Sequence, residues 1–321
     1  MQEQPILKII NDYNVSRKLY INDYLSEMYI NKYINKIYVI NLHNNILRKN
    51  YIIKLMEKYN INFELIIVPT LSNREYEIIN NRYINLGEAG CYLSHMFCLN
   101  DAIVNNYQKI IIFEDDIILH KQFHLLFENI TNNFVFDILM LGCNDFHFRK
   151  LNYKFVENNL YKPHINTKFL YGTHSIMYSS KGIREMFISR LNNPTFMDNN
   201  LLEFSDKFRT TFFISYPNLV VSDYSQTNIN HNFWITNKLK ENYYLKNCFD
   251  DKFNFTDYNF IYLKPLELCT KVDFSKSYAE NMMNILKLFF YNNINNADII
   301  YMRLVYDFFN IEDLEFISSS K

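Results

Sequence analysis

Along the first two thirds of the chain, short apolar runs alternate with longer stretches in which apolar residues recur with the spacing of a helix. Six runs have strand length and little regular polar alternation, which predicts strands buried inside a sheet. Their ranges are 36–42, 63–68, 109–113, 136–141, 172–180 and 211–215. Pro69 and Gly142 follow the second and fourth runs, where they are expected to end the strands.

The stretches between these runs predict helices at 46–59, 88–106, 121–130 and 181–191. In the first of them, the apolar stripe expected to face the core contains Leu47, Ile52, Leu55, Met56 and Tyr59. The basic side chains expected to face away from it are Arg48, Lys49, Lys54 and Lys58.

Strands and helices that alternate at these lengths favour right-handed crossovers and a mostly parallel sheet. The fold class is therefore α/β, with a Rossmann-type sheet flanked by helices. We divide the chain into a helical N-terminal extension over 1–34, an α/β domain over 35–235 and a mainly helical C-terminal region over 236–321. In that last region a capping-box spacing from Ser277 to Glu280 predicts a helix to Tyr291, and a second helix is predicted at 297–309.

Charge and hydropathy exclude several classes of partner. The formal net charge is −1 and no basic stripe occurs, so a nucleic-acid partner is not expected. The N-terminus lacks the features of a signal peptide, and no apolar segment has the length of a transmembrane helix. We expect a soluble, cytoplasmic protein. Peripheral contact with a membrane is compatible with this expectation.

The five cysteines are odd in number and lie mostly in apolar periodic stretches, so we interpret them as reduced core thiols. Cys91 and Cys98 are seven residues apart on one face of a predicted helix. No histidine pair with zinc-finger spacing accompanies them, and a metal role is not predicted for them.

The run that begins at Lys109 ends in three consecutive carboxylates, Glu114, Asp115 and Asp116. A cluster of like charges needs a cation opposite it, and a divalent metal is the simplest one. Ligands of open α/β sheets bind beyond the carboxyl ends of such strands. The competing interpretation is a solvated turn, because charged residues are usually exposed.

Several motifs occur in the order and spacing of glycosyltransferase family 25, which the chain resembles over about 36–230. They are Ile40-Asn41-Leu42, Arg48, GEAGCYLSH over 87–95, Glu114-Asp115-Asp116, Gly172-Thr173-His174, Phe196-Met197-Asp198, Tyr216-Pro217-Asn218-Leu219-Val220 and Ser225-Gln226-Thr227-Asn228-Ile229. The resemblance identifies 35–235 as the glycosyltransferase domain and implies a GT-A-like fold.

The resemblance also implies the reaction: a hexose, galactose or glucose first, moves from a UDP-sugar to a hydroxyl of a glycan or protein, with inversion at the anomeric carbon. The implied cofactor is Mn²⁺ or Mg²⁺. A metal that bridges the diphosphate to Glu114 and Asp116 would stabilise the departing UDP. His231 is a further candidate metal ligand, because some GT-A enzymes supply a late ligand in this region.

Inversion needs a base that takes the proton of the acceptor hydroxyl. Asp198 is the candidate, since it matches an acidic position of the family. The alternative is that Asp198 caps the helix that follows it.

Four residues are candidates for binding the donor. Asn41 lies at a strand end, where ligands bind, and Arg48 could neutralise donor phosphate. Ser94 and His95 follow two glycines near a helix start, which favours an anion. The ordinary alternatives are a solvated arginine on the outer helix face and a helix terminus where serine and histidine are tolerated.

Gly172 and His174 are candidates for binding the sugar or the acceptor. Because a histidine beside an apolar strand is often a hydrogen-bonded part of the scaffold, that alternative stays open for His174.

Other function classes remain to be weighed. A phosphoacceptor receiver domain has its acidic pair on the first strand, much earlier than here. A metal-dependent phosphohydrolase or nuclease needs more His and Asp ligands at several strand ends than the sequence offers. A non-catalytic member of the fold that binds glycans or protein partners is the third alternative.

Overall fold

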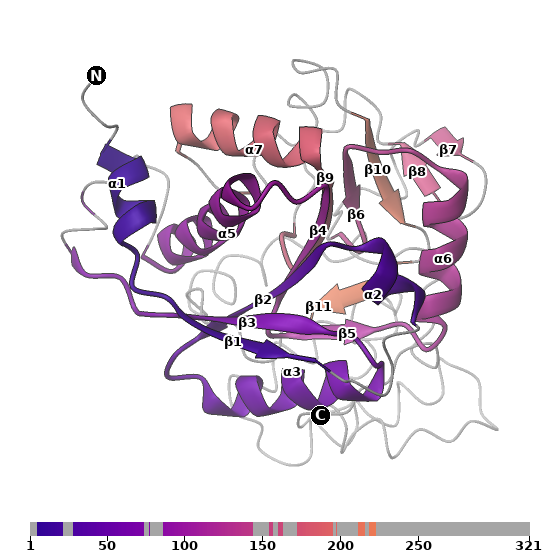
Figure 1. Ribbon diagram of the computed structural model, residues 1–321, viewed down its shortest axis with the longest axis horizontal. Helices are drawn as coiled ribbons and strands as arrows, with labels where there is room; N and C mark the ends of the chain where they lie inside the picture. Colours follow the sequence, from indigo (N-terminus) through magenta and orange to yellow (C-terminus); the bar gives the residue numbers. More distant parts are fainter. Residues whose placement is uncertain are drawn as a thin grey trace, which may run out of the picture. The chain divides into compact units, whose positions relative to one another are not determined.

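Nine strands form one sheet at the centre of the described part of the chain (Figure 1). They are β1 (Ser16–Tyr20), β2 (Lys36–Leu42), β3 (Phe63–Val68), β4 (Lys109–Glu114), β6 (Ile138–Met140), β7 (Lys154–Val156), β8 (Leu160–Lys162), β9 (Ser175–Ser179) and β10 (Phe212–Ser215). Their order across the sheet is β1-β3-β2-β4-β9-β6-β10-β8-β7. A second, two-stranded sheet joins β5 (Ile117–Leu119) to β11 (Val220–Ser222).

The computed structural model describes residues 5–21, 28–73, 77, 86–143, 154–156, 160–162, 172–194, 197, 211–215 and 218–222. All of them belong to one of the two compact units of the chain, which consists of Met1–Asn144 and Leu151–Ser222. The predicted C-terminal helices, Asp198 and His231 lie outside the described residues. Within those ranges, no helix has both the length and the apolar character needed to span a bilayer.

The sheet is mixed rather than mostly parallel as the sequence predicted. β2 runs parallel to both β3 and β4, and β10 runs parallel to β6. β9, however, lies between β4 and β6 and is antiparallel to both. The α/β class is confirmed, but the direction of a strand depends on its connections, which an apolar run does not encode.

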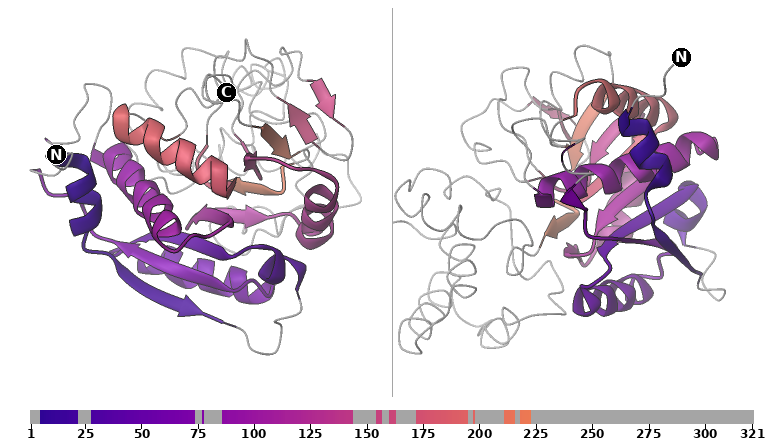
Figure 2. Two further views of the ribbon diagram at one scale, coloured as in Figure 1. Left: turned by 45° about the horizontal axis from the view of Figure 1, so that its top comes forward. Right: turned by 90° about the vertical axis from the view of Figure 1, so that its left-hand side faces the viewer.

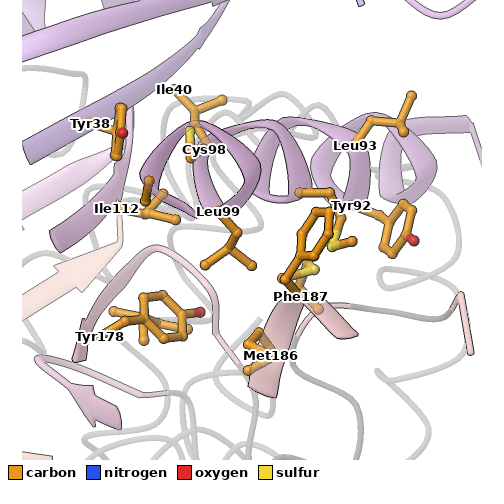
Figure 3. Close-up of a cluster of buried hydrophobic side chains, with 14 of the residues drawn as sticks. Tyr38, Ile40, Tyr92, Leu93, Cys98, Leu99, Ile112, Tyr178, Met186 and Phe187 are labelled. Carbon is orange, nitrogen blue, oxygen red and sulfur yellow. The ribbon is translucent and has the colours of Figure 1, made fainter. Parts of the chain in front are cut away.

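Helices cover both faces of the sheet (Figure 2). α1 (Pro5–Asp12), α5 (Leu86–Val104) and α7 (Ser180–Asn192) lie on one face and share a single buried cluster with it. Figure 3 shows Tyr92 and Leu99 of α5 in the same buried cluster as Met186 and Phe187 of α7. α3 (Ile46–Lys58) covers the other face. Strands buried on both sides explain why β2 and β4 are almost continuously apolar.

Two further helices lie beside α3. α6 (Phe123–Asn133) follows β5, and α2 (Tyr29–Tyr33) precedes β2. The stacked rings of Phe123 and Phe127 in α6 contact Tyr59 at the end of α3 and Tyr29 in α2, respectively. These aromatic contacts fix α6 next to the end of α3.

The N-terminal extension contains a strand that the sequence analysis missed. We predicted a helical segment over 1–34, but Ser16–Tyr20 is β1, which pairs antiparallel with β3 at the edge of the sheet. Arg17 binds Glu64 of β3 at 2.7 Å and Asp101 of α5 at 2.6 Å. Because β1 is almost entirely exposed, it has no apolar alternation that could have identified it.

The predicted inward and outward faces of α3 are wrong at two adjacent positions, Leu47 and Arg48. Ile52, Leu55 and Met56 are buried as expected, but Leu47 is 61% exposed and Arg48 is 7% exposed. Helical periodicity placed the charged residue outside, whereas an acidic partner at the end of β4 holds it inside.

Candidate functional site

Several of the sequence-predicted site residues that the structure describes lie at one edge of the sheet. β2 and β4 are parallel, so Asn41 of β2 and Glu114 of β4 lie near the same edge. β9 is antiparallel to β4, so its N-terminal end, with Thr173 and His174 just before it, lies at that edge too. The backbone N–H of Glu114 donates to the carbonyl oxygen of His174 at 2.9 Å, which joins the two segments.

Glu114 is held by three side chains that all reach the same oxygen, Oε1. The Thr173 hydroxyl donates to it at 2.5 Å, His95 Nε2 lies 3.3 Å away and Cys91 Sγ lies 3.8 Å away. Cys91 and His95 are four residues apart on α5 and therefore share one face of the helix. No hydrogen bond or ion pair from a described residue reaches Oε2, and 28% of the Glu114 side chain is exposed. One side of the carboxylate is thus fixed and the other remains accessible.

These contacts keep Glu114 ionised. Burial raises the pKa of the carboxyl, but the hydrogen bond and charge of His95 and the hydrogen bond from Thr173 outweigh it and lower the pKa to about 2. His95 itself is fully buried, and its other ring nitrogen, Nδ1, has no hydrogen-bond partner among the described residues.

Asp115 points into a different group of residues, at the N-terminus of α3. It accepts a hydrogen bond from Asn41 Nδ2 at 2.6 Å and one from Arg48 Nη1 at 2.9 Å. Asn45, the N-cap of α3, accepts a hydrogen bond from the Arg48 backbone N–H and fixes this first turn. Burial raises the pKa of Asp115, while the charge of Arg48 and the two hydrogen bonds oppose that rise.

Asp116 lies beside the same arginine. Its Oδ2 is 3.3 Å from Arg48 Nη1, and 16% of its side chain is exposed. The alternation of a strand predicted that Glu114 and Asp116 would approach one ion while Asp115 pointed elsewhere. The described contacts instead pair Asp116 with Asp115 on Arg48, because the chain leaves the strand after Glu114. A shared ion between Glu114 and Asp116 stays a prediction.

The remaining candidates have mainly local partners. The Ser94 hydroxyl donates to the carbonyl oxygen of Gly90 at 2.6 Å within α5. Gly172 has a φ of 112°, a conformation that favours glycine. His174 is buried with Nε2 3.5 Å from the Val220 carbonyl oxygen, and burial lowers its pKa. The scaffold interpretation of Ser94 and His174 accounts for these contacts, and their ligand-binding roles stay predictions.

One group of side chains in the described part of the chain could hold a metal ion. The ligand atoms of Cys91, His95 and Glu114 all lie within 4.8 Å of one another. The sequence predicted no metal role for Cys91, and Thr173 was not among the predicted site residues. The spacing of Cys91 and His95 by four residues on one helix is a signal that could have identified the pair.

The comparison with protein-family models gives one match that bears on this site. The model of glycosyltransferase family 25, described as an LPS biosynthesis protein, matches residues 34–188. Residues 34–188 belong to glycosyltransferase family 25. The matched segment contains β2, β4 and β9 together with Glu114, His95 and Arg48. The match of this segment to a glycosyltransferase family identifies the protein as an enzyme that transfers a sugar.

Comparison with other proteins adds little to the family 25 assignment. None of the curated protein sequences matches the chain. Among solved structures, a proposed glucose-1-phosphate thymidylyltransferase from Bacillus anthracis in complex with a sucrose is 13% identical, with a TM-score of 0.32, over 62% of this chain and 75% of that one. A197 from STIV is 9% identical, with a TM-score of 0.27, over 61% and 97% of the two chains.

Proposed function

We propose that the family 25 domain transfers a hexose, galactose or glucose, from a UDP-sugar to a hydroxyl group of a glycan or protein acceptor, with inversion at the anomeric carbon. The donor would lie beyond the carboxyl ends of β2 and β4, where parallel strands of α/β proteins bind ligands. The gathering of Glu114, Asp115 and Asp116 with Asn41 and Arg48 at this edge is the observation that carries the proposal.

The charge of this edge supports a divalent cation. Among the described residues, Asp115 and Asp116 share Arg48, and Glu114 faces His95. Two carboxylates on one arginine leave an excess of negative charge, which would repel an anionic diphosphate unless a cation were bound. Glu114 and Asp116 are both partly exposed, and carboxylate oxygens suit Mn²⁺ or Mg²⁺. We assign these two residues to the cation. When bound, it would neutralise the diphosphate as UDP departs.

The protein's own residues prepare the site for the donor. Arg48 and Asn41 hold Asp115 in place and so fix the chain between β4 and β5. Thr173 and His95 keep the Glu114 carboxylate ionised and oriented. Asp198 is proposed as the base that accepts the proton of the acceptor hydroxyl; it lies outside the described residues, as does His231, the proposed third ligand.

The test is a mass-spectrometric screen of UDP-sugars with Mn²⁺ and a panel of glycan acceptors, followed by NMR of the anomeric configuration of the product. Asp116→Ala should abolish turnover and leave the far-UV circular dichroism unchanged. Glu57→Gln, an exposed carboxylate on α3, serves as the matched control and should retain full activity. Wild-type rates in Asp116→Ala would refute the cation assignment. A UDP-sugar that binds but is never consumed would favour a binding protein.

A further inference from the structure

The group formed by Cys91, His95 and Glu114 has the composition of a transition-metal site. We infer that these three side chains bind a zinc-like divalent ion. This ion is distinct from the cation proposed for the donor, and Glu114 would be a ligand of both. The inference rests on the contacts around Glu114 Oε1 and requires neither Asp116 nor a nucleotide, so it stands or falls independently of the proposed reaction.

The spacing of the ligand atoms supports the inference. Zinc bonds of about 2.0 Å to nitrogen or oxygen and 2.3 Å to sulfur, in tetrahedral geometry, place the ligand atoms about 3.3–3.6 Å apart. His95 Nε2 lies 3.3 Å and Cys91 Sγ lies 3.8 Å from Glu114 Oε1. The third edge, from Cys91 to His95, is within 4.8 Å. An approach of the cysteine by about 1 Å would complete one face of the tetrahedron.

The surroundings of the three ligands resemble those of an open metal site. Two ligands come from one turn of α5, which is fixed by its burial in the core, and the third comes from the end of β4. The Thr173 hydroxyl donates to Oε1 and would orient the carboxylate from outside the ligand set. Cys91 and Glu114 are partly exposed, which provides an entry path and a fourth position for water.

The chemical types of the three ligands determine which metal ion they would prefer. A thiolate and an imidazole favour Zn²⁺ or Co²⁺, whereas Mg²⁺ and Mn²⁺ prefer oxygen ligands. Binding requires the thiolate of Cys91 and an unprotonated Nε2 of His95. The thiol proton leaves for solvent when the metal arrives, and the proton of His95 is then carried on Nδ1. The competing explanation is a hydrogen-bonded cluster in which Thr173, His95 and the Cys91 thiol all donate to Oε1 and no metal binds.

The experiment uses the full-length protein without nucleotide. Elemental analysis after dialysis against Zn²⁺ should give about one ion per chain above the level of a Cys91→Ala variant, and Co²⁺ should give a thiolate charge-transfer absorption band. Cys91→Ala and His95→Ala should each lower metal affinity by more than about 100-fold, since the loss of a residue outside the ligand set already costs 10–100-fold. Cys98→Ala, on the same helix but buried in the apolar core, should leave the affinity unchanged.

Two further measurements keep the inference testable if a ligand variant fails to fold. Asp116→Asn should retain the zinc, because Asp116 is not among the three ligands. In the wild-type protein, Zn²⁺ should slow the alkylation of Cys91, mapped by peptide mass spectrometry, by at least 10-fold. Folded wild-type protein that binds neither Zn²⁺ nor Co²⁺, a cobalt band that persists in Cys91→Ala, or alkylation that zinc does not slow would each overturn the inference.

Discussion

The Arg48 guanidinium lies 2.9 Å from the Asp115 carboxylate, and both side chains are buried between the end of β4 and the start of α3. This ion pair joins the first turn of a helix to the acidic end of the central strand. It also explains how adjacent carboxylates are tolerated in the fold: an arginine lies opposite Asp115 and Asp116, and a histidine lies opposite Glu114.

Arg48→Met should reduce the free energy of unfolding by about 3 kcal/mol or more, because removing one partner leaves a buried charge without compensation. Urea unfolding followed by circular dichroism measures the change. Lys54→Met, an exposed position of the same helix, should change the free energy by less than about 0.5 kcal/mol. Equal losses in the two variants would show that the Arg48 pair does not stabilise the fold.

Glu114 should make the stability depend on pH. Its pKa is about 2 in the folded protein and has an ordinary value of 4.5, so its contribution is fully present above pH 4.5 and is lost as the pH falls toward 2. At neutral pH the contribution is on the order of 3 kcal/mol. The difference in unfolding free energy between wild type and Glu114→Gln should therefore shrink by about 1 kcal/mol between pH 7 and pH 3.5.

The control for this pH dependence is Glu57→Gln, which replaces an exposed carboxylate. The difference in unfolding free energy between Glu57→Gln and wild type should stay near zero at pH 7 and at pH 3.5. If the difference in unfolding free energy between Glu114→Gln and wild type is constant with pH, the folded protein does not stabilise the ionised form of this carboxylate.

Gly142 lies against the two-stranded sheet of β5 and β11, and Gly90 serves as its control. A Cβ atom at Gly142 would lie 1.7 Å from the carbonyl oxygen of Val220, the first residue of β11, whereas at Gly90 in α5 the nearest atom is 4.0 Å away. Gly142→Ala should cost about 3 kcal/mol or more, since the backbone of β11 must shift. Gly90→Ala should be neutral or stabilise the protein by up to about 1 kcal/mol. Thermal unfolding of both variants would check this, and a Gly142→Ala protein as stable as wild type would contradict it.

Arg17 should anchor β1 to the rest of the sheet. Its guanidinium binds Glu64 and Asp101, whose side chains are about nine tenths buried, while Arg17 itself is 36% exposed. Arg17→Met should destabilise the protein by about 1 kcal/mol, and the loss should shrink between 50 mM and 500 mM NaCl because salt screens exposed pairs. Lys18→Met, at the next position of the same exposed strand, should have little effect at either salt concentration. A loss that is the same at both salt concentrations would argue for a packing effect instead.

The elements that the sequence predicted best are those buried on both faces. The observed bounds of β2 and β3 equal the predicted ones, and β4 differs from the prediction by one residue. Burial on both sides demands an unbroken apolar run, and such a run is visible without knowledge of its neighbours. The exposed edge strand β1 and the short strand β5 were missed, since neither has a periodicity of its own.

The sequence predicted a location for the candidate site but not the contacts between its side chains. The position of Glu114 at the end of an apolar strand led to the prediction of a site there, and the segment 34–188 that matches family 25 contains this strand end. The contacts of Glu114 with Cys91 and Thr173 could not be read from the sequence, because they join segments separated by 23 and 59 residues.

By itself, the sequence determined the α/β class, the central strands and the acidic strand end, since each of these follows from local hydrophobic pattern and residue type. Only the tertiary structure decided that β9 runs antiparallel between β4 and β6, that Arg48 is buried, and that Glu114 and Asp116 have different partners. Those features depend on which segments meet in space. A charged side chain becomes buried only when a distant residue supplies its partner, and no local pattern records that encounter.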